Sequence, residues 1–552
     1  MVLQVDSSRP TVQLGSQGKV IGITLAQDDA HFRPRAVDCF LGIPYAVPPV
    51  GDRRFRPAER PPYSPDNVHD ASKYGPAAPG KQLVKPDPGA PEIVYSEDCL
   101  TANVFRQAGS ARDGHLLPVA IYVHGGAFNR GTAAMHNTAS MVSWSAEPFI
   151  AVSFNYRIGA LGFLPSSLSA KEGLLNLGLK DQILLFEWVK ENAAAFGGDR
   201  DNITLFGLSA GAHSIGHHLL HYREGVAPLF NRVIIESGAP TSRAVRPHDA
   251  PIHEEQFRGF LAAAGVPSDI PENEVIPFLR TLPSETVQQA QTEIFDKYNP
   301  SLKWAFQPVI DGDIIPRPPL ETWRSGKWHK VPIMTGFQRN EGSLYVDKTM
   351  SKSEEFVHFF RDLLPLLSEE DLQTIDELYP DPAKVPNSPY KEDRDGVGPQ
   401  YKRIEAAYGH YAYVAPARQT AEFASSNIPV YLYQWAAIST LLNGAQHADN
   451  ARYEVCDPKV LAISENQAEL AKTLNSYVTS FITRGDPNAA SNSEGRPEWV
   501  AYSKDSPRAL VFGLGNEELI GGGLGRTATL VDDEWGRKES EFWWSKVDLS
   551  QQ

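Results

Sequence analysis

Six short apolar runs, spread over more than half of the chain, constrain the fold more than any other feature of this sequence. They are continuous rather than alternating, which is typical of strands that are buried on both faces of a parallel sheet. The segment 177–198 between two of them predicts a helix, because its apolar residues recur every three or four positions and it stops at two glycines. The runs are LLPVAIYV (116–123), FIAVSFNY (149–156), NITLFG (202–207), RVIIES (232–237), KVPIMTGF (330–337) and IPVYLYQWA (428–436).

Alternation of such strands with helices predicts an α/β architecture. Two segments, 250–300 and 350–425, interrupt the alternation; we expect them to be mostly helical and to form part of a lid over the pocket. The stretch 44–95 is rich in proline, with 12 prolines between 44 and 91, and proline favours extended and turn conformations. It is either a surface wrap or one wall of a binding cleft, and the sequence leaves both interpretations open.

Charge and hydropathy narrow the class of protein. The net charge is −15, which disfavours a nucleic-acid surface or an anionic membrane patch. No apolar run reaches the roughly 18 residues that span a bilayer, and the N-terminal segment lacks the pattern of a secretory signal. We therefore expect a cytoplasmic protein without a membrane span. Three cysteines, Cys39, Cys99 and Cys456, form no disulfide framework, and whether two of them are bridged stays open.

A candidate nucleophile lies in Gly207-Leu208-Ser209-Ala210-Gly211, which fits the pattern G-x-S-x-G. The pattern alone is weak. Here an expected strand runs directly into it and an expected helix runs out, which is the strand–turn–helix context that the pattern requires. We expect the serine hydroxyl to stand on a tight turn at the mouth of a cleft, with the alternative that the serine merely caps a helix.

A candidate oxyanion site follows the first apolar run, at His124-Gly125-Gly126. Consecutive glycines after a strand can turn two backbone N–H groups toward one point, where a tetrahedral intermediate needs donors for its negative oxygen. The N–H of Ala210, just after the candidate nucleophile, is the third expected donor. We expect His124 to brace the loop by hydrogen bonding rather than to act as a base.

With these segments in view, the chain resembles the type-B carboxylesterases, the family that also holds cholinesterases and fungal lipases. The resemblance covers most of the chain and implies an α/β-hydrolase fold, a large, mostly parallel sheet flanked by helices, in a single catalytic domain over 1–552. Length alone would predict three or four domains. The matching segments include FLGIPYAVPPVGDRRFRP (40–57), SEDCLTANVF (96–105), NYRIGALGF (155–163), FNRVIIESGAP (230–240), PVIDGDIIP (308–316), GFQRNEGSLY (336–345) and RGDPN (484–488).

The resemblance also implies the partners of the nucleophile. It makes Glu341 the acid and His447, in GAQHADN, the base of a catalytic triad, in the chain order serine, acid, histidine. It makes Ser237 a serine that hydrogen-bonds near the triad. The family usually carries an acidic residue three positions after this histidine, where the chain has Asn450. That departure leaves the supporting contacts of the histidine loop in question rather than the role of the histidine.

These residues predict a serine carboxylic-ester hydrolase that works through an acyl-enzyme and needs no cofactor and no metal. We expect a small-molecule ester, neutral and apolar rather than cationic: Leu208 stands where the family often has glutamate, and 40–100 contain no tryptophan for a cation–π site. Two alternatives stay open. One is a biosynthetic lactonase or acyl transferase with the same triad, and the other is an inactive recognition module. The sequence does not indicate an oligomeric state.

Overall fold

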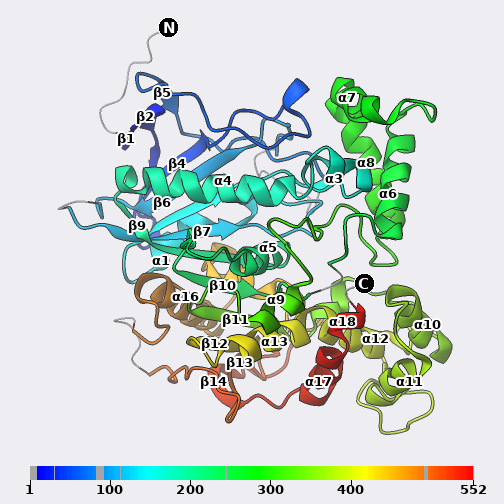
Figure 1. The fold of residues 1–552 in the computed structure, drawn as a ribbon. Helices are drawn as coiled ribbons and strands as arrows, with labels where there is room; N and C mark the ends of the chain where they lie inside the picture. Colours follow the sequence, from blue (N-terminus) through cyan, green and yellow to red (C-terminus); the bar gives the residue numbers. More distant parts are fainter. Residues whose placement is uncertain are drawn as a thin grey trace.

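A mixed sheet of eleven strands runs through the molecule, with helices on both of its faces (Figure 1). This computed structural model describes residues 9–29, 32–81, 93–111, 114–242, 245–489 and 495–550. The strand order is β14-β13-β12-β11-β10-β9-β7-β8-β6-β4-β3. The seven adjacent strands from β8 to β13 are parallel to one another, whereas β14 at one edge and β6, β4 and β3 at the other pair in antiparallel fashion.

The six apolar runs form six consecutive members of this parallel block, as predicted. Their side chains alternate between two buried clusters, one on each face of the sheet: Ile121 and Val123 face one cluster, whereas Ala120 and Tyr122 face the other. Both faces are covered, which explains why the runs are continuously apolar. The strands are β7 (Leu117–Val123), β8 (Ile150–Phe154), β9 (Gly198–Leu208), β10 (Arg232–Glu236), β11 (Ile333–Gln338) and β12 (Val430–Trp435).

Helices cover the two faces of the sheet in two sets. On one face, α1 (Thr138–Trp144) and α16 (Glu465–Arg484) contribute to the cluster that holds Tyr122. On the other face lie α4 (Leu177–Asn192), α5 (Ala210–Leu220) and α13 (Ala415–Ala424). The predicted helix is thus α4, and the chain leaves it through a short 3-10 turn that ends at Gly197 with a φ of +87°. A left-handed residue of this kind favours glycine.

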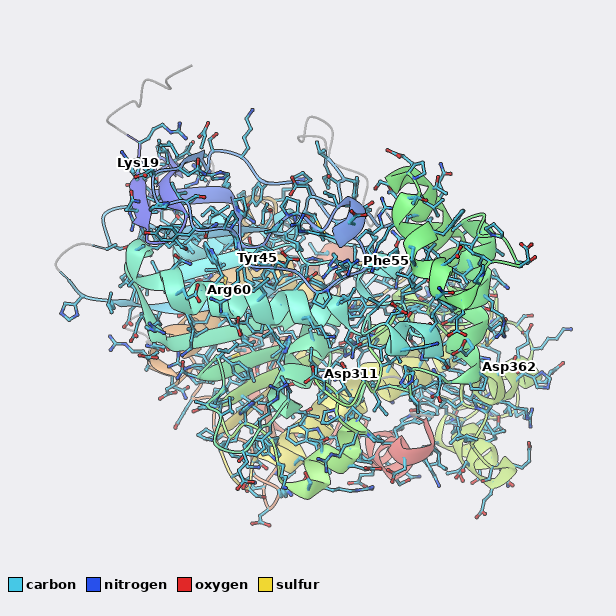
Figure 2. All side chains as sticks on the ribbon, turned by 45° about the horizontal axis from the view of Figure 1, so that its top comes forward. Lys19, Tyr45, Phe55, Arg60, Asp311 and Asp362 are labelled. Atoms are coloured by element: carbon cyan, nitrogen blue, oxygen red, sulfur yellow. The ribbon has the colours of Figure 1, made fainter. Side chains whose placement is uncertain are left out.

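The proline-rich segment packs on the body of the protein as far as it is described. The side chains of Tyr45 and Phe55 are buried, and Arg60 pairs with Glu187 and Glu191 on α4, beside which Figure 2 shows it. At its far end the backbone N–H of residue 81 donates to the carbonyl of Asn129, 3.0 Å away. The segment therefore reaches the loop after β7. Residues 82–92 lie outside the described residues, so the choice between a surface wrap and a cleft wall stays open.

Helices occupy much of 250–300 and 350–425. They are α6 (Pro251–Ala263), α7 (Glu272–Thr281), α8 (Ser284–Tyr298), α10 (Ser353–Leu363), α11 (Glu369–Leu378) and α12 (Tyr401–Gly409), with a π turn at His410–Val414. In Figure 1, α6, α7 and α8 lie at the upper right and α10, α11 and α12 at the lower right, whereas α13, at the end of the second segment, lies against the sheet. A turn of π-helix joins α12 to α13, so the helical backbone continues from one to the other. The proposed part of these segments in a substrate pocket stays a prediction, as does the single domain over 1–552.

Smaller elements complete the fold. A separate sheet of three short strands, in the order β1-β2-β5, lies near the N-terminus. None of the helices in the described ranges combines the length and the apolar character that a bilayer crossing needs. The remaining strands are β1 (Thr11–Leu14), β2 (Gly18–Ile21), β3 (Ile23–Leu25), β4 (Val37–Pro44), β5 (Val68–Asp70), β6 (Thr101–Gln107), β13 (Arg508–Leu514) and β14 (Arg526–Asp532). The remaining helices are α2 (Gly159–Gly162), α3 (Ser167–Lys171), α9 (Pro319–Ser325), α14 (Asp449–Glu454), α15 (Pro458–Leu461), α17 (Arg537–Ser545) and α18 (Val547–Ser550).

Candidate active site

The candidate residues follow the carboxyl ends of neighbouring parallel strands. Ser209 comes directly after β9, Ser237 directly after β10, and Glu341 three residues after β11, while His447 lies in the loop that follows β12. The register brings Leu208 of β9 opposite Glu236 of β10. In sheets of this kind the carboxyl ends of the strands meet at one edge, where ligands usually bind. The topology therefore gathers these residues at one edge of the sheet.

Ser209 occupies a strained turn between β9 and α5. Its φ is +59° and its ψ is −124°, a conformation that non-glycine residues rarely adopt and that occurs mainly at functional sites. Its backbone N–H donates to the carbonyl of Glu236, 2.9 Å away. Both glycines of the motif are required here, because a Cβ on Gly207 or Gly211 would lie 2.6 or 1.9 Å from the carbonyl oxygen of Val123.

The glycine loop after β7 lies against the nucleophile turn. A Cβ on Gly125 would lie 3.1 Å from the Cβ of Ser209, and Gly126 has a φ of +112° that favours glycine. Within the described residues, no hydrogen bond uses the backbone N–H of Gly125 or Gly126, and the N–H of Ala210 belongs to the first helical residue of α5, which has no acceptor within its helix. Three donors close to Ser209 are thus left for another acceptor.

His124 lies against this loop, and its expected bracing role stays a prediction. Its Nδ1 lies 2.9 Å from the carbonyl oxygen of Gly125, and its ring stacks on Tyr156, whose hydroxyl donates to the carbonyl of His124. Burial lowers the pKa of His124 to about 4, so the imidazole is neutral near pH 7. A neutral ring that is committed to the loop is suited to bracing.

Glu341 and His447 form a close pair in a buried environment. His447 Nδ1 lies 2.5 Å from Glu341 Oε2, while Glu341 Oε1 accepts from the backbone N–H of Gln338, 2.8 Å away. The rings of Tyr345 and Tyr413 contact the imidazole with centroids 5.4 and 4.6 Å away. Both carboxylate oxygens act as acceptors. Because Oε2 needs a donor opposite it, the histidine carries its proton on Nδ1.

The turn that carries Glu341 and the loop that carries His447 are bound to each other by the backbone. Asn340 donates its N–H to the carbonyl of Ala445, and its side-chain oxygen accepts from the N–H of Ala445. A Cβ on Gly444 would lie 2.2 Å from that same oxygen, and Gly444 has a φ of +65°. Asn340 and Gly444 therefore hold the acid and the histidine in one register. Neither was among the predicted residues, although both lie in segments that resemble the family, GFQRNEGSLY and GAQHADN.

Asn450, which stands where the family usually has an acidic residue, forms hydrogen bonds through both its side-chain oxygen and its amide nitrogen. Its side-chain oxygen accepts from Gln338 Nε2 at 2.6 Å, and its amide nitrogen donates to Glu236 Oε1 at 2.8 Å and to the Tyr433 hydroxyl at 3.1 Å. Gln338 Nε2 also lies 3.4 Å from Ser237 Oγ. The loop's supporting contacts, left in question by the sequence, are therefore present and run through an amide. Gln338, Tyr433 and Glu236 are members that sequence reasoning did not find.

The other nitrogen of the imidazole, His447 Nε2, is buried and has no hydrogen-bond partner in the described part of the chain. Ser209 Oγ is therefore not hydrogen-bonded to it in this structure. Hydrogen bonds between nucleophile and base are often long before substrate binds. What the arrangement can do chemically is hold an imidazole with one free basic nitrogen at the edge of the sheet that also presents a strained serine and unused N–H donors.

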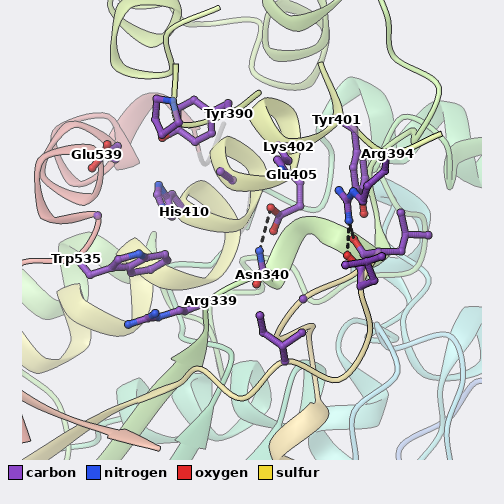
Figure 3. A pocket seen from close by; sticks show the side chains of 17 residues that line it. Arg339, Asn340, Tyr390, Arg394, Tyr401, Lys402, Glu405, His410, Trp535 and Glu539 are labelled. Carbon is purple, nitrogen blue, oxygen red and sulfur yellow. Dashed lines mark hydrogen bonds between the residues drawn. The ribbon is translucent and has the colours of Figure 1, made fainter. Parts of the chain in front are cut away.

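A cavity of about 410 Å³ is lined in part by Asn340 and Gly444, and it does not lie at Ser209. Figure 3 shows its lining, with Asn340 and Glu405 hydrogen-bonded in the middle and Trp535 and His410 on one side. Neither Ser209 nor His447 lines it. Because burial raises the pKa of Glu405 to about 8 and lowers that of His410 to about 3, both are largely uncharged near pH 7.

Comparison with known proteins identifies the family. The model of the carboxylesterase family matches residues 8–526. The chain belongs to the carboxylesterase family. As a family member it is a carboxylic ester hydrolase, which confirms the resemblance and the class of enzyme predicted from the sequence.

Individual relatives agree with this assignment. "Secreted lipase 4" of Gibberella zeae is 35% identical over 534 residues, covering 96% of this chain and 91% of that protein. "Lipase 1" of Geotrichum candidum is 30% identical, covering 87% and 89%. The crystal structure of Aspergillus niger EstA superposes with a TM-score of 0.81 at 26% identity over 99% of this chain and 100% of that one. This similarity confirms the α/β-hydrolase fold.

One question that the sequence left open, the state of the cysteines, is answered by the structure, and one expectation, the cellular location, is left without support. Cys39, Cys99 and Cys456 are all buried and free, so no two of them are bridged. The expected cytoplasmic location has no support, because the first of the relatives is named as a secreted protein.

Proposed function

We propose that this carboxylesterase hydrolyses esters through a triad of Ser209, Glu341 and His447 and an acyl-enzyme intermediate. The observation that carries the proposal is the orientation of His447: Glu341 engages Nδ1 at 2.5 Å, and Nε2 is buried with no hydrogen-bond partner among the residues that the structure describes. An imidazole held in this way can act as a general base, because its Nε2 can accept the proton of a nucleophile.

In the proposed reaction, Ser209 Oγ attacks the ester carbonyl while His447 Nε2 takes its proton. The negative oxygen of the tetrahedral intermediate accepts from the N–H groups of Gly125, Gly126 and Ala210, each worth about 3 kcal/mol of barrier. His447 then returns the proton to the leaving alkoxide. Water, deprotonated by the same nitrogen, attacks the acyl-enzyme; His447 then returns this proton to Ser209 Oγ as the ester bond breaks and the acid is released. Glu341 stabilises the imidazolium in both halves.

The structure supports a preference for a neutral ester. Leu208, next to the nucleophile, is apolar and only 8% exposed, and two tyrosines flank the histidine. We infer that the acyl and alcohol groups are uncharged and apolar. A choline ester hydrolysed with strong preference over its neutral isostere would contradict this inference.

Pre-steady-state kinetics with a p-nitrophenyl ester tests the mechanism. We expect a burst of p-nitrophenol equivalent to one enzyme, followed by slower turnover as the acyl-enzyme hydrolyses. Ser209→Ala is expected to remove the burst and to lower kcat by several orders of magnitude, with the thermal unfolding of the protein unchanged. A Ser209→Ala variant that keeps near-wild-type turnover would refute the assignment of the nucleophile.

A further inference from the structure

Two carboxyl groups meet in the core next to the proposed triad. Glu236 is the last residue of β10 and Glu454 the last residue of α14, and they are 1% and 2% exposed. The two carboxyls lie within hydrogen-bonding reach of one another. Within the described ranges neither forms an ion pair with a cation. Two carboxylates in such a place would repel strongly, so the pair retains one proton.

The donors around the pair decide which carboxyl carries the charge. Glu236 Oε1 accepts from the Tyr433 hydroxyl and from Asn450 Nδ2, each at 2.8 Å. Glu454 Oε1 has no hydrogen-bond partner in the described part of the chain. The anion therefore lies on Glu236, where donors already converge, and the proton lies on Glu454, which donates it to Glu236. Burial raises the pKa of both groups, that of Glu454 well above its ordinary value.

The titratable groups that face the pair from neighbouring strands are Tyr122 of β7 and Tyr433 of β12, and burial raises the pKa of both phenols. Both are neutral at any pH near 7. The pair is thus one buried negative charge held by neutral donors.

Glu236 is connected to the segments that carry the three proposed catalytic residues. The backbone carbonyl of Glu236 accepts from the N–H of Ser209. Its carboxylate binds Asn450, one turn after His447 on the loop and helix that carry the histidine. Asn450 in turn accepts from Gln338, whose backbone N–H donates to Glu341. One hydrogen-bonded chain thus runs from the acid pair to the carboxylate that orients the imidazole.

We propose that Glu236 and Glu454 are positioning residues of this esterase: they share one proton, and the single charge on Glu236 fixes α14, and with it His447, against Glu341 and Ser209. The proposal rests on the proposed triad. It accounts for how the chain holds the histidine loop with an asparagine at position 450: the charge is supplied from β10 instead of from that position.

Two substitutions of similar size, Glu236→Gln and Glu454→Gln, distinguish the effect of the charge on Glu236 from a general effect on packing. In Glu454→Gln the amide N–H replaces the carboxylic O–H, so we expect kcat within about threefold of wild type. In Glu236→Gln no carboxylate remains where the donors converge, because Glu454 lacks these donors, and we expect kcat to fall at least tenfold with KM nearly unchanged. Glu454→Ala removes the donor, and its kcat is expected to be low and to be restored by the glutamine variant. Equal kcat values in the two glutamine variants would overturn the assignment of the charge.

Infrared difference spectroscopy at pH 7 tests the shared proton without reference to activity. The spectrum of wild type minus Glu454→Gln is expected to contain the C=O stretch of one protonated carboxyl. The matched control, Glu321→Gln, changes an exposed carboxylate and is expected to lose no such band. If Glu454→Gln also loses none, Glu454 is ionised and the proposal is wrong. If Glu236→Gln fails to fold, the activity and spectrum of Glu454→Gln decide the question.

The failure of this proposal is distinguishable from the failure of the triad. If Ser209→Ala were active, the triad would be wrong, whereas the infrared band would still report the proton on Glu454. If Ser209→Ala is inactive and the band is absent, the triad stands and the acid pair does not.

Discussion

Glu405 is a buried carboxyl group whose pKa is raised in the folded protein. Replacing it with glutamine measures how much stability the protein loses as the pH rises because of this group. The side chain is 5% exposed; Oε2 accepts from Asn340 Nδ2 at 3.3 Å, and Oε1 has no partner in the described part of the chain. Desolvation raises its pKa from 4.5 to about 8, with Glu341 adding to the effect. The side chain contacts Asn340, which binds the two proposed catalytic loops together (Figure 3).

The magnitude follows from linkage. Below pH 4.5 the carboxyl is protonated in both states, and its contribution to stability is fully present. Between pH 4.5 and 8 the unfolded chain ionises and the folded protein does not, so the folded state loses about 1.4 kcal/mol per pH unit. The loss is complete above pH 8 and amounts to at most about 5 kcal/mol. An unfolding entropy of about 2.1 cal/mol/K per residue over 552 residues converts this to about 4 °C.

Thermal scans at fixed rate, from pH 4.5 to pH 9, provide the assay. The difference in apparent Tm, Glu405→Gln minus wild type, is expected to rise by about 4 °C between pH 4.5 and 8 and then to stay level. The control Glu321→Gln, at an exposed position, is expected to give a difference independent of pH. Parallel curves for wild type and Glu405→Gln would refute the reasoning, because they would mean that Glu405 titrates normally in the folded protein.

Two further changes test the site itself. Glu341→Gln removes the charge that orients His447, and kcat is expected to fall roughly 10⁴-fold, as in other serine triads, with KM little changed; a loss below tenfold in steady-state assays would argue against Glu341 as the acid. Gly126→Ala would bring a Cβ within 2.1 Å of the carbonyl of Arg130, so the loop must shift and kcat is expected to fall by about 10²–10³. Gly15→Ala, which meets nothing within 4 Å, is the control, and equal kcat in the two alanine variants would contradict the oxyanion assignment.

The sheet was predictable because burial on both faces leaves a continuous apolar signal, and the six runs were found within a few residues of their true ends. The strands toward the two edges of the sheet were harder to predict. β14 has no fully buried residue, and β4 pairs with β6 through an irregular register between Phe40 and Ile43, so neither strand carries a simple pattern. The conformation at Ser209 was also predictable, because the two glycines are required by the carbonyl of Val123.

The polar connections of the site were not predictable from the sequence. Whether Asn450 meets Glu236 depends on the registers of β10, β11 and β12 and on where α14 begins, and each of these is set by tertiary packing. The family pattern indicates an acid at position 450 and would suggest that its absence weakens the loop. Instead, the side-chain amide of Asn450 donates to the carboxylate of Glu236 on β10. Such compensation between distant segments becomes visible only in three dimensions.

The most direct test of the proposed triad is the site of reaction with an organophosphonate ester. We expect one adduct per chain on the peptide that contains Ser209, found by mass spectrometry, with esterase activity lost in proportion to labelling, and no adduct in Ser209→Ala. Labelling at another serine that tracks the loss of activity, or full inactivation of Ser209→Ala by the same reagent, would contradict it.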